Sequence, residues 1–336
     1  MPHERLPAAA SHTEVHVSAP SGPDVPRGDV PRGDVPPWVD RAAYPFRPHR
    51  FDTGEGRLSY VDEGVGPPVV LVHGTPTWSF LYRRLIPPLV AAGHRVLAPD
   101  HLGFGLSDRP ATAGYRPEDH ARRLAALLDA LAAGDPAFRD LTLVVHDLGG
   151  PVGLSYAVER PERVARLVVG NTWCWPLDDD PNIARGARLL GGALGRVLYT
   201  RFDVERRVIL PRVFADRRRL TPALAAQYAG PFPDPDSRLP LWEVARGLLD
   251  ASAWYDALWA RRDRLLRKPT LLLWGMRDPF FGPAYLARWR EALPDAEVAE
   301  LPHAGHFVQE EAAAEVAAHV ESFLTRGGRG PRAGAP

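Results

Sequence analysis

An aspartate follows a short apolar run at a point where the sequence predicts a sharp turn. Residues 141–146 are mostly apolar, Asp147 comes next, and Gly149 and Gly150 open a run with helical character. Strand, tight turn and helix in this order form a nucleophile elbow, which lifts one side chain above a sheet. Glycine permits the tight turn, and the positive end of a helix keeps a carboxylate ionised. Asp147 is therefore a candidate nucleophile, although aspartate is also a common helix N-cap.

A histidine near the end of the chain has the properties of a general base. His306 lies in a loop after a predicted strand over residues 297–301, and histidine titrates close to neutral pH. His303 competes for the role, but Gly305 frees the loop and the apolar Phe307 anchors the chain after it. We therefore favour His306 as the base that activates water.

A second aspartate occupies the same kind of position, directly after a strand. Asp278 follows the apolar residues 270–274 and precedes Pro279. As the third member of a catalytic triad it would accept the Nδ1 hydrogen of His306 and fix the tautomer of the ring. A plain turn aspartate before proline is the structural alternative.

A loop after another apolar run is suited to stabilising negative charge. It begins at Gly74, directly after the predicted buried strand at residues 69–73. The backbone N–H of Thr75, paired with that of Leu148, would form an oxyanion hole. His73 ends the strand beneath this loop, and we interpret it as structural.

Three other patterns carry weaker signals. Ser155 lies inside a predicted helix at residues 151–159, and the elbow has no serine, which argues against a classical serine esterase. His303 and His306 have the spacing of a zinc pair, but no convincing partner ligands accompany them. The glycine pattern that begins at Gly103 lacks the third glycine of a dinucleotide fingerprint. The sequence therefore predicts neither a metal nor a cofactor.

Short β-branched runs alternate with amphipathic runs through most of the chain, which predicts the elements that position these side chains. This alternation is typical of an α/β fold with a doubly wound, mostly parallel sheet. The near-continuous apolar run at residues 69–73 indicates a strand buried on both faces. We expect strands over residues 58–62, 69–73, 95–98, 141–145, 165–169, 270–274 and 297–301, and helices over 79–91, 117–132, 151–159, 283–292 and 309–324.

The alternation stops between about residues 175 and 267, where prolines interrupt helical runs. A stretch this long is not a loop inside a compact domain, so we expect an inserted helical cap over the carboxyl ends of the strands, where α/β sheets bind ligands. The N-terminal stretch has a proline-rich tandem repeat and cannot form an apolar face, which predicts disorder. The expected organisation is a disordered tail at 1–37, a hydrolase-like core at 38–174 and 268–326, a helical cap at 175–267 and a disordered tail at 327–336.

The composition excludes several classes of protein. The 336 residues include 41 Lys+Arg and 41 Asp+Glu, and this zero formal net charge argues against non-specific binding to nucleic acid or anionic lipid. No run approaches the roughly 18 apolar residues of a membrane span, and the N-terminus lacks the apolar stretch of a secretory signal. We therefore expect a cytoplasmic protein that binds neither nucleic acid nor membrane. The sequence does not indicate its oligomeric state.

Five segments, in order along the chain, share the pattern of one known family. They are residues 73–83 (HGTPTWSFLYR), 98–108 (APDHLGFGLSD), 144–150 (VVHDLGG), 220–233 (LTPALAAQYAGPFP) and 304–310 (AGHFVQE). Over about residues 40–325 the chain resembles the haloalkane dehalogenases, the aspartate-nucleophile branch of the α/β-hydrolase superfamily. The resemblance implies an α/β-hydrolase fold without a cofactor, and it assigns nucleophile, acid and base to Asp147, Asp278 and His306. The partners would be water and a small apolar electrophile, which forms an ester with Asp147 before hydrolysis.

Two positions depart from the pattern of that family. The dehalogenases usually have a tryptophan directly after the nucleophile, where its indole N–H holds the leaving halide, and this chain has Leu148. They usually have asparagine or glutamate after the His-Gly of the oxyanion loop, and this chain has Thr75. We therefore expect poor turnover of chloroalkanes and better turnover of bromides or iodides. Leu148→Trp should raise bromoalkane turnover if the pocket has room.

Several aromatic residues are candidates for contact with the substrate. We place Trp78, Trp173, Trp175 and Tyr228 in the substrate pocket. One of the three tryptophans is an alternative donor to the halide, but we interpret each of them rather as a packing residue of the core or the cap. In an epoxide hydrolase a cap tyrosine protonates the opening oxygen, and Tyr228, Tyr199 and Tyr255 are candidates for that role.

Hydrolysis of a carbon–halogen bond is the leading hypothesis, and other functions stay open. An epoxide hydrolase or a β-lactone decarboxylase would use the same triad. A non-catalytic hydrolase-fold binding protein is an alternative of a different class, although the presence of all three triad residues favours an enzyme. Halide release and diol formation from a panel of bromoalkanes, chloroalkanes and epoxides would distinguish these functions.

Overall fold

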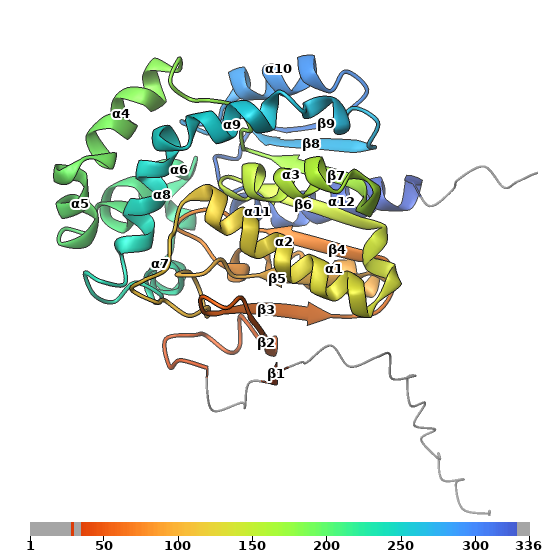
Figure 1. The fold of residues 1–336 in the computed structure, drawn as a ribbon, viewed down its shortest axis with the longest axis horizontal. Coiled ribbons are helices and arrows are strands. Elements are labelled where there is room, and N and C mark those ends of the chain that lie inside the picture. Colours follow the sequence, from red (N-terminus) through yellow and green to blue (C-terminus); the bar gives the residue numbers. More distant parts are fainter. Residues whose placement is uncertain (1–27, 30–34, 328–336) are drawn as a thin grey trace, which may run out of the picture.

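The computed structural model describes residues 28–29 and 35–327, and a nine-stranded sheet runs through this part of the chain. The strands stand in the order β1-β2-β3-β5-β4-β6-β7-β8-β9 (Figure 1). The pairings from β5 to β9 are parallel, whereas those from β1 to β5 are antiparallel. The strands are β1 (Gly28–Asp29), β2 (Pro48–Asp52), β3 (Arg57–Glu63), β4 (Pro68–Val72), β5 (Arg95–Pro99), β6 (Leu141–His146), β7 (Val164–Gly170), β8 (Thr270–Gly275) and β9 (Glu297–Leu301). The predicted fold class, a doubly wound and mostly parallel sheet, is confirmed.

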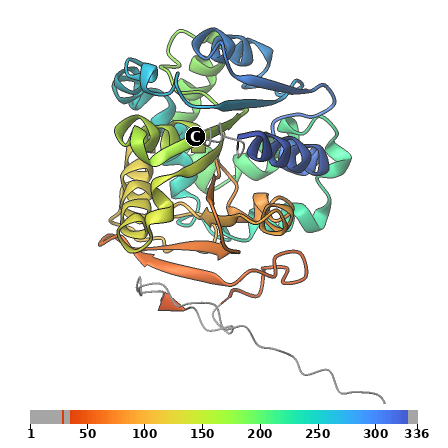
Figure 2. The same ribbon diagram turned by 90° about the vertical axis from the view of Figure 1, so that its right-hand side faces the viewer.

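The central strands are buried on both faces because their side chains alternate between two apolar clusters. Val70 and Val72 of β4 belong to one cluster, and Val69 and Leu71 belong to the other. Helices cover both faces of the sheet, as a buried parallel sheet requires, with α2 and α3 on one face and α1 and α12 on the other (Figure 2). The helices that flank the sheet are α1 (Ile86–Ala91), α2 (Pro117–Gly134), α3 (Gly149–Glu159), α10 (Pro283–Ala292), α11 (Val308–Glu311) and α12 (Ala313–Gly327).

Two predicted helices are interrupted, and two strands, β1 and β2, are absent from the prediction. The single helix expected over residues 79–91 is a short 3₁₀ helix, Ser79–Tyr82, followed by α1. Prolines in the first turn of α1 have no N–H to donate, so a helix begins there and cannot run through from the preceding turn. The helix expected over 309–324 is likewise two helices, α11 and α12. Strand β2 has the sequence PHRFD, which lacks a clear apolar alternation.

A run of helices separates β7 from β8 and gathers beyond one end of the sheet (Figure 1). It comprises α4 (Pro181–Gly191), α5 (Ala193–Thr200), a π-helical turn (Glu205–Ile209), α6 (Leu210–Val213), α7 (Pro222–Ala229), α8 (Leu239–Asp250) and α9 (Ser252–Trp259). Helices α4, α5 and α8 contact one another, and α9 contacts α3 beside the sheet. This segment corresponds to the cap expected over residues 175–267.

The two tails expected to be disordered, residues 1–37 and 327–336, lie mostly outside the described residues. Within the first of them, Gly28–Asp29 form β1. This strand pairs with Arg50 and His49 of β2 in antiparallel register.

Candidate active site

Asp147 stands at a sharp turn between β6 and α3. Its φ angle is +52°, in the left-handed region that non-glycine residues rarely adopt. The turn is packed tightly, since a Cβ on Gly149 would lie 2.1 Å from the carbonyl oxygen of Val72. The Thr172 hydroxyl donates a hydrogen bond to the carbonyl oxygen of Asp147, which helps to hold this backbone. The geometry is that of a nucleophile elbow.

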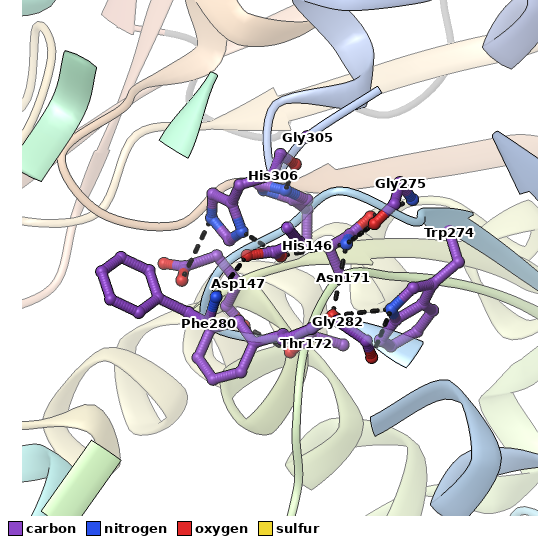
Figure 3. A network of polar contacts seen from close by, with 12 residues as sticks. His146, Asp147, Asn171, Thr172, Trp274, Gly275, Phe280, Gly282, Gly305 and His306 are labelled. Carbon is purple, nitrogen blue, oxygen red and sulfur yellow. Dashed lines mark hydrogen bonds and ion pairs between the residues drawn. The ribbon is translucent and has the colours of Figure 1, made fainter. Parts of the chain in front are cut away.

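The three residues predicted to form a triad meet at the carboxyl ends of their strands, and Figure 3 shows His306 beside Asp147. The Nδ1–H of His306 donates to Asp278 Oδ2 over 2.7 Å. On the other side of the ring, Nε2 lies 3.5 Å from Asp147 Oδ2. All three side chains are buried. The histidine is therefore oriented by one carboxylate and faces the other, which is the arrangement of a nucleophile, a base and an orienting acid.

The other oxygen of the Asp147 carboxylate meets the predicted oxyanion loop. The backbone N–H of Thr75 donates to Asp147 Oδ1 over 2.8 Å. Gly74 cannot be replaced without a clash, because a Cβ there would lie 2.1 Å from that same oxygen. The second predicted donor, Leu148, directly precedes α3 as its N-cap. The N–H of Thr75 thus lies where a negative oxygen on residue 147 is stabilised.

The loop that carries His306 is fixed through its backbone. The N–H of His306 donates to the carbonyl oxygen of Val213 in α6 over 2.9 Å. The carbonyl oxygen of His306 accepts from His146 Nε2 over 2.8 Å. The N–H of Gly305 donates to Glu311 Oε2 over 2.7 Å. The imidazole is therefore held by contacts with β6, with α11 and with a helix of the segment between β7 and β8.

The electrostatics of the triad favour a charged imidazole in the free protein. Burial alone would lower the pKa of His306, but the negative carboxylates of Asp278 and Asp147 outweigh burial and raise this pKa to about 10. Burial tends to raise the pKa of Asp278, and the charge and hydrogen bond of His306 outweigh it and hold that pKa below its ordinary value. Loss of the charge on Asp147 would remove part of the stabilisation of the imidazolium.

Asn171 is a part of the site that the sequence analysis missed. It follows β7 directly, at a φ of +36°. Its Nδ2 donates to Asp278 Oδ2 and to the carbonyl oxygen of Gly275, both over 3.0 Å, and its Oδ1 accepts from the N–H of Gly275 over 2.8 Å. Figure 3 shows Asn171 beside the loop after β8. The sequence carries a signal for this residue, because Asn171 is a polar residue directly after a buried strand, as is Asp147.

Asp147 and His306 open onto an apolar cavity of about 140 Å³. Its walls come from the loops after β4, β6, β7, β8 and β9 and from the helices between β7 and β8. The apolar lining includes Ile183, Leu190, Leu241, Val244, Phe280 and Phe281. Trp173 lines this cavity as predicted, and so does the candidate tyrosine Tyr199. Glu205 lines it as well, and no sequence signal had marked that residue.

Three of the four residues predicted to line the pocket lie elsewhere, and the prediction was wrong for them. The indole N–H of Trp78 donates to the carbonyl oxygen of Gln227. Trp175 packs against Tyr285 of α10 and against two other tryptophans. The Tyr228 hydroxyl is bound to the carboxylate of Glu310. Each of these side chains is buried in packing that does not reach the cavity.

The remaining candidate residues that the sequence analysis considered lie outside the cavity. Tyr255 is buried against Trp173 and does not line the cavity, and neither does Leu148, whose side chain is fully buried. His303 pairs with Glu315 at the surface, away from the triad. The Ser155 hydroxyl donates within α3 to the carbonyl oxygen of Val152.

Across the described part of the chain, no group of three or more His, Cys, Asp and Glu side chains is placed to hold a metal ion. None of the described helices is both long and apolar enough to cross a membrane.

The fold and the site together define an α/β hydrolase, and comparison with known proteins agrees. Residues 67–313 match the family described as alpha/beta hydrolase fold. The chain is 39% identical to "Haloalkane dehalogenase 2" of Mycobacterium tuberculosis over 294 residues, which cover 84% of this chain and 96% of the relative. It is also 35% identical to "Cis-3-alkyl-4-alkyloxetan-2-one decarboxylase" of Shewanella oneidensis over 289 residues, with coverage of 84% and 89%.

The fold is also similar to that of a solved haloalkane dehalogenase structure. The haloalkane dehalogenase DatA from Agrobacterium tumefaciens is similar at a TM-score of 0.73 and 28% identity, over 83% of this chain and 96% of that one. The similarity thus extends over nearly the whole of that structure. The chain belongs to the α/β-hydrolase fold family, within its haloalkane dehalogenase-like group, and it is a hydrolase.

Proposed function

We propose that the protein hydrolyses a small apolar electrophile in two steps, through an ester on Asp147. In the first step the carboxylate of Asp147 attacks a saturated carbon, and the leaving group departs with the bonding electrons. The observation that carries this proposal is the position of the Asp147 carboxylate. One oxygen accepts from Thr75 N–H, the other faces His306, and both border an apolar cavity.

The second step returns the free enzyme. Formation of the ester removes the negative charge of Asp147, so the pKa of His306 falls and the ring can release its proton. Neutral His306, still oriented by Asp278, then takes a proton from water, and the hydroxide attacks the ester carbonyl. The N–H of Thr75, together with that of Leu148, stabilises the oxyanion that forms on residue 147.

A haloalkane is the substrate class that the relatives favour, because several of them are named haloalkane dehalogenases. The apolar walls of the cavity suit an alkyl chain, and the chemistry needs water and no cofactor. Opening of a β-lactone is the second candidate. It is favoured by the relative named as an oxetan-2-one decarboxylase and by the absence of an N–H donor on the side chain of Leu148.

His306→Gln tests the ester directly, since the variant keeps the nucleophile and loses the base. Incubated with 1-bromobutane, it should gain the mass of one butyl group, and peptide mapping should find that group on Asp147. Asp147→Asn combined with His306→Gln is the matched control and should gain nothing. An adduct on another residue would contradict the proposal. So would the absence of any adduct with a substrate that the wild type turns over.

A further inference from the structure

The active-site cavity contains a second acidic side chain whose role the two-step mechanism leaves unexplained. Among the described residues that line the cavity, Asp147 and Glu205 are the acidic ones. Glu205 begins the π-helical turn Glu205–Ile209 and is only 5% exposed. Arg206, the next residue in the chain, pairs with a different carboxylate, that of Asp203, which also lies 3.9 Å from Arg238.

Two other buried glutamates show what a structural carboxylate looks like in this protein. The carboxylate of Glu310 accepts hydrogen bonds from Nη1 and Nη2 of Arg83 and from the hydroxyl of Tyr228. Glu311 accepts three backbone N–H groups, from Gly305 and from two residues after Val213. Among the described residues no ion pair includes Glu205, and its hydrogen-bond partner is the hydroxyl of Tyr199, which also lines the cavity. Glu205 therefore borders the reaction cavity with a neutral hydroxyl as its hydrogen-bond partner, whereas arginine or backbone N–H groups bind Glu310 and Glu311.

The protonation state of Glu205 is set by its surroundings. The pKa of Glu205 is raised to about 7, and burial is the main cause. The negative charges of Asp147 and Asp203 also raise this pKa, whereas the hydrogen bond from Tyr199 and the charge of His306 lower it. Near neutral pH the group is thus shared between a carboxylic acid and a carboxylate, as a general acid should be.

We propose that Glu205 is a general acid that protonates an oxygen leaving group, and that the protein opens small apolar epoxides. The inference rests on the proposed nucleophile, Asp147. The carboxylate of Asp147 forms a C–O bond with a ring carbon, the ring C–O bond breaks, and the ring oxygen takes the proton of Glu205. Hydrolysis of the ester by the His306-activated water then frees Asp147, and Glu205 recovers a proton from solvent. The net change is epoxide plus water to a vicinal diol.

We propose an oxygen leaving group, and not a halide, because an oxygen needs a proton in order to leave. An alkoxide is a strong base and leaves an alkyl carbon with difficulty unless it is protonated, whereas bromide leaves as a stable anion. A carboxylic acid in the cavity is therefore useful to an epoxide and without use to a bromide. In its carboxylate form Glu205 would also repel a departing halide.

The test compares two substrates in three proteins: wild type, Glu205→Gln and Glu205→Leu. With 1,2-epoxybutane, kcat for diol formation should fall by about 100-fold or more in both variants, because neither side chain can transfer a proton. With 1-bromobutane, bromide release in both variants should change by a much smaller factor than diol formation, because bromide leaves without a proton. An equal loss with both substrates would mean that Glu205 has a structural role and would overturn the inference. The wild-type kcat for the epoxide should decline as pH rises through about 7, and this decline should be missing for the bromide.

The outcomes separate this inference from the proposed function. If His306→Gln forms no adduct with either substrate, the nucleophile assignment fails. If it forms the butyl adduct but the wild type opens no epoxide, Glu205 is not an acid for oxygen and the inference is overturned. It is equally overturned if Glu205→Leu and the more conservative Glu205→Gln, which preserves the shape of the side chain, both open the epoxide at the wild-type rate.

Discussion

At the scale of single residues, the charge on His306 is set by two carboxylates with different tasks. In the proposed mechanism Asp147 is the group that reacts, so its charge disappears when the ester forms. Asp278 keeps its charge throughout, and its 2.7 Å hydrogen bond to Nδ1 holds the ring in one orientation. Asn171 in turn donates to Asp278 and fixes that carboxylate. Orientation and reactivity are thus assigned to separate residues.

Asp278→Asn should separate the two chemical steps. The variant loses the negative charge that raises the pKa of His306, and it replaces one acceptor oxygen with an NH2 donor that can favour the wrong tautomer, so water activation suffers most. We expect kcat to fall by about 10⁴-fold, while the ester on Asp147 still forms and accumulates. Quenched-flow measurement of the adduct and of product checks this expectation. Asp295→Asn, at an exposed carboxylate, is the control, and an equal loss of both steps in Asp278→Asn would contradict the assignment.

Leu148→Trp tests whether the usual halide-binding residue can be restored by one substitution. From the sequence, a gain in bromoalkane turnover is expected only where the pocket has room for the indole. Leu148 is fully buried in the apolar cluster and does not line the cavity. We now expect overpacking that lowers the free energy of unfolding by about 1–3 kcal/mol, without faster bromide release. Thermal melts and bromide assays check it, with Leu148→Met as the volume-conserving control; a stable variant with higher turnover would show that the indole reaches the cavity.

At the scale of elements, the sequence indicates where the strands end but not how the helices between β7 and β8 pack. Asp147 and Asp278 follow the buried strands β6 and β8, and His306 follows the edge strand β9. The carboxyl ends of parallel strands meet at one edge of a sheet. The positions of these residues follow from the chain order alone. Glu205 lies in a helical segment whose packing no local pattern specifies. The same holds for Trp78 and Tyr228, which are aromatic and close in sequence to site motifs but point into the interior.

The loop that carries His306 is built around a glycine for reasons of space. A Cβ on Gly305 would lie 2.4 Å from the carbonyl oxygen of Val213 and 2.7 Å from the backbone nitrogen of Ala215. Both are backbone atoms of the segment between β7 and β8, so they cannot swing aside as a flexible side chain would. The contact couples the position of the base to the position of that segment.

Gly305→Ala should therefore reduce activity by moving His306 away from Asp147. We expect a fall in kcat of about 10- to 100-fold, since misplacement of a reacting group by about 1 Å costs about 10²-fold. Gly192→Ala is the matched control, because a Cβ there would meet only ordinary contacts, the nearest at 3.6 Å. Steady-state kinetics on both variants checks the expectation. Wild-type kcat in Gly305→Ala would show that the loop adapts without displacing the base.

At the scale of the whole molecule, four buried histidines link stability to pH. His73, His101 and His120 pack ring against ring, with centroids 4.3 Å and 5.0 Å apart. His146 lies beside the triad, its ring centroid 4.6 Å from that of His306. Burial lowers the pKa of all four, to about 4 for His101 and His146. Below about pH 6.5 the unfolded chain therefore binds protons at these positions that the folded protein excludes.

Two buried carboxyls act in the opposite direction. Burial raises the pKa of Asp100 to about 6 and that of Glu205 to about 7, so the folded protein binds protons there that the unfolded chain releases. His306 adds no slope in this range, because its raised pKa leaves it protonated in both states below about pH 6.5. Four histidines against two carboxyls leave a net difference of roughly two protons in favour of the unfolded state.

The free energy of unfolding should consequently fall as pH decreases from about 6 to 4.5, by about 3 kcal/mol per pH unit at most. His120→Leu should reduce this slope by about 1.4 kcal/mol per pH unit, because it removes one group that must stay neutral in the folded protein. His319→Gln, at an exposed position, should leave the slope unchanged. Urea denaturation at a series of pH values measures all three proteins. If His120→Leu does not alter the slope, His120 is already protonated in the folded state. The buried histidine cluster would then tolerate a positive charge on the His120 ring.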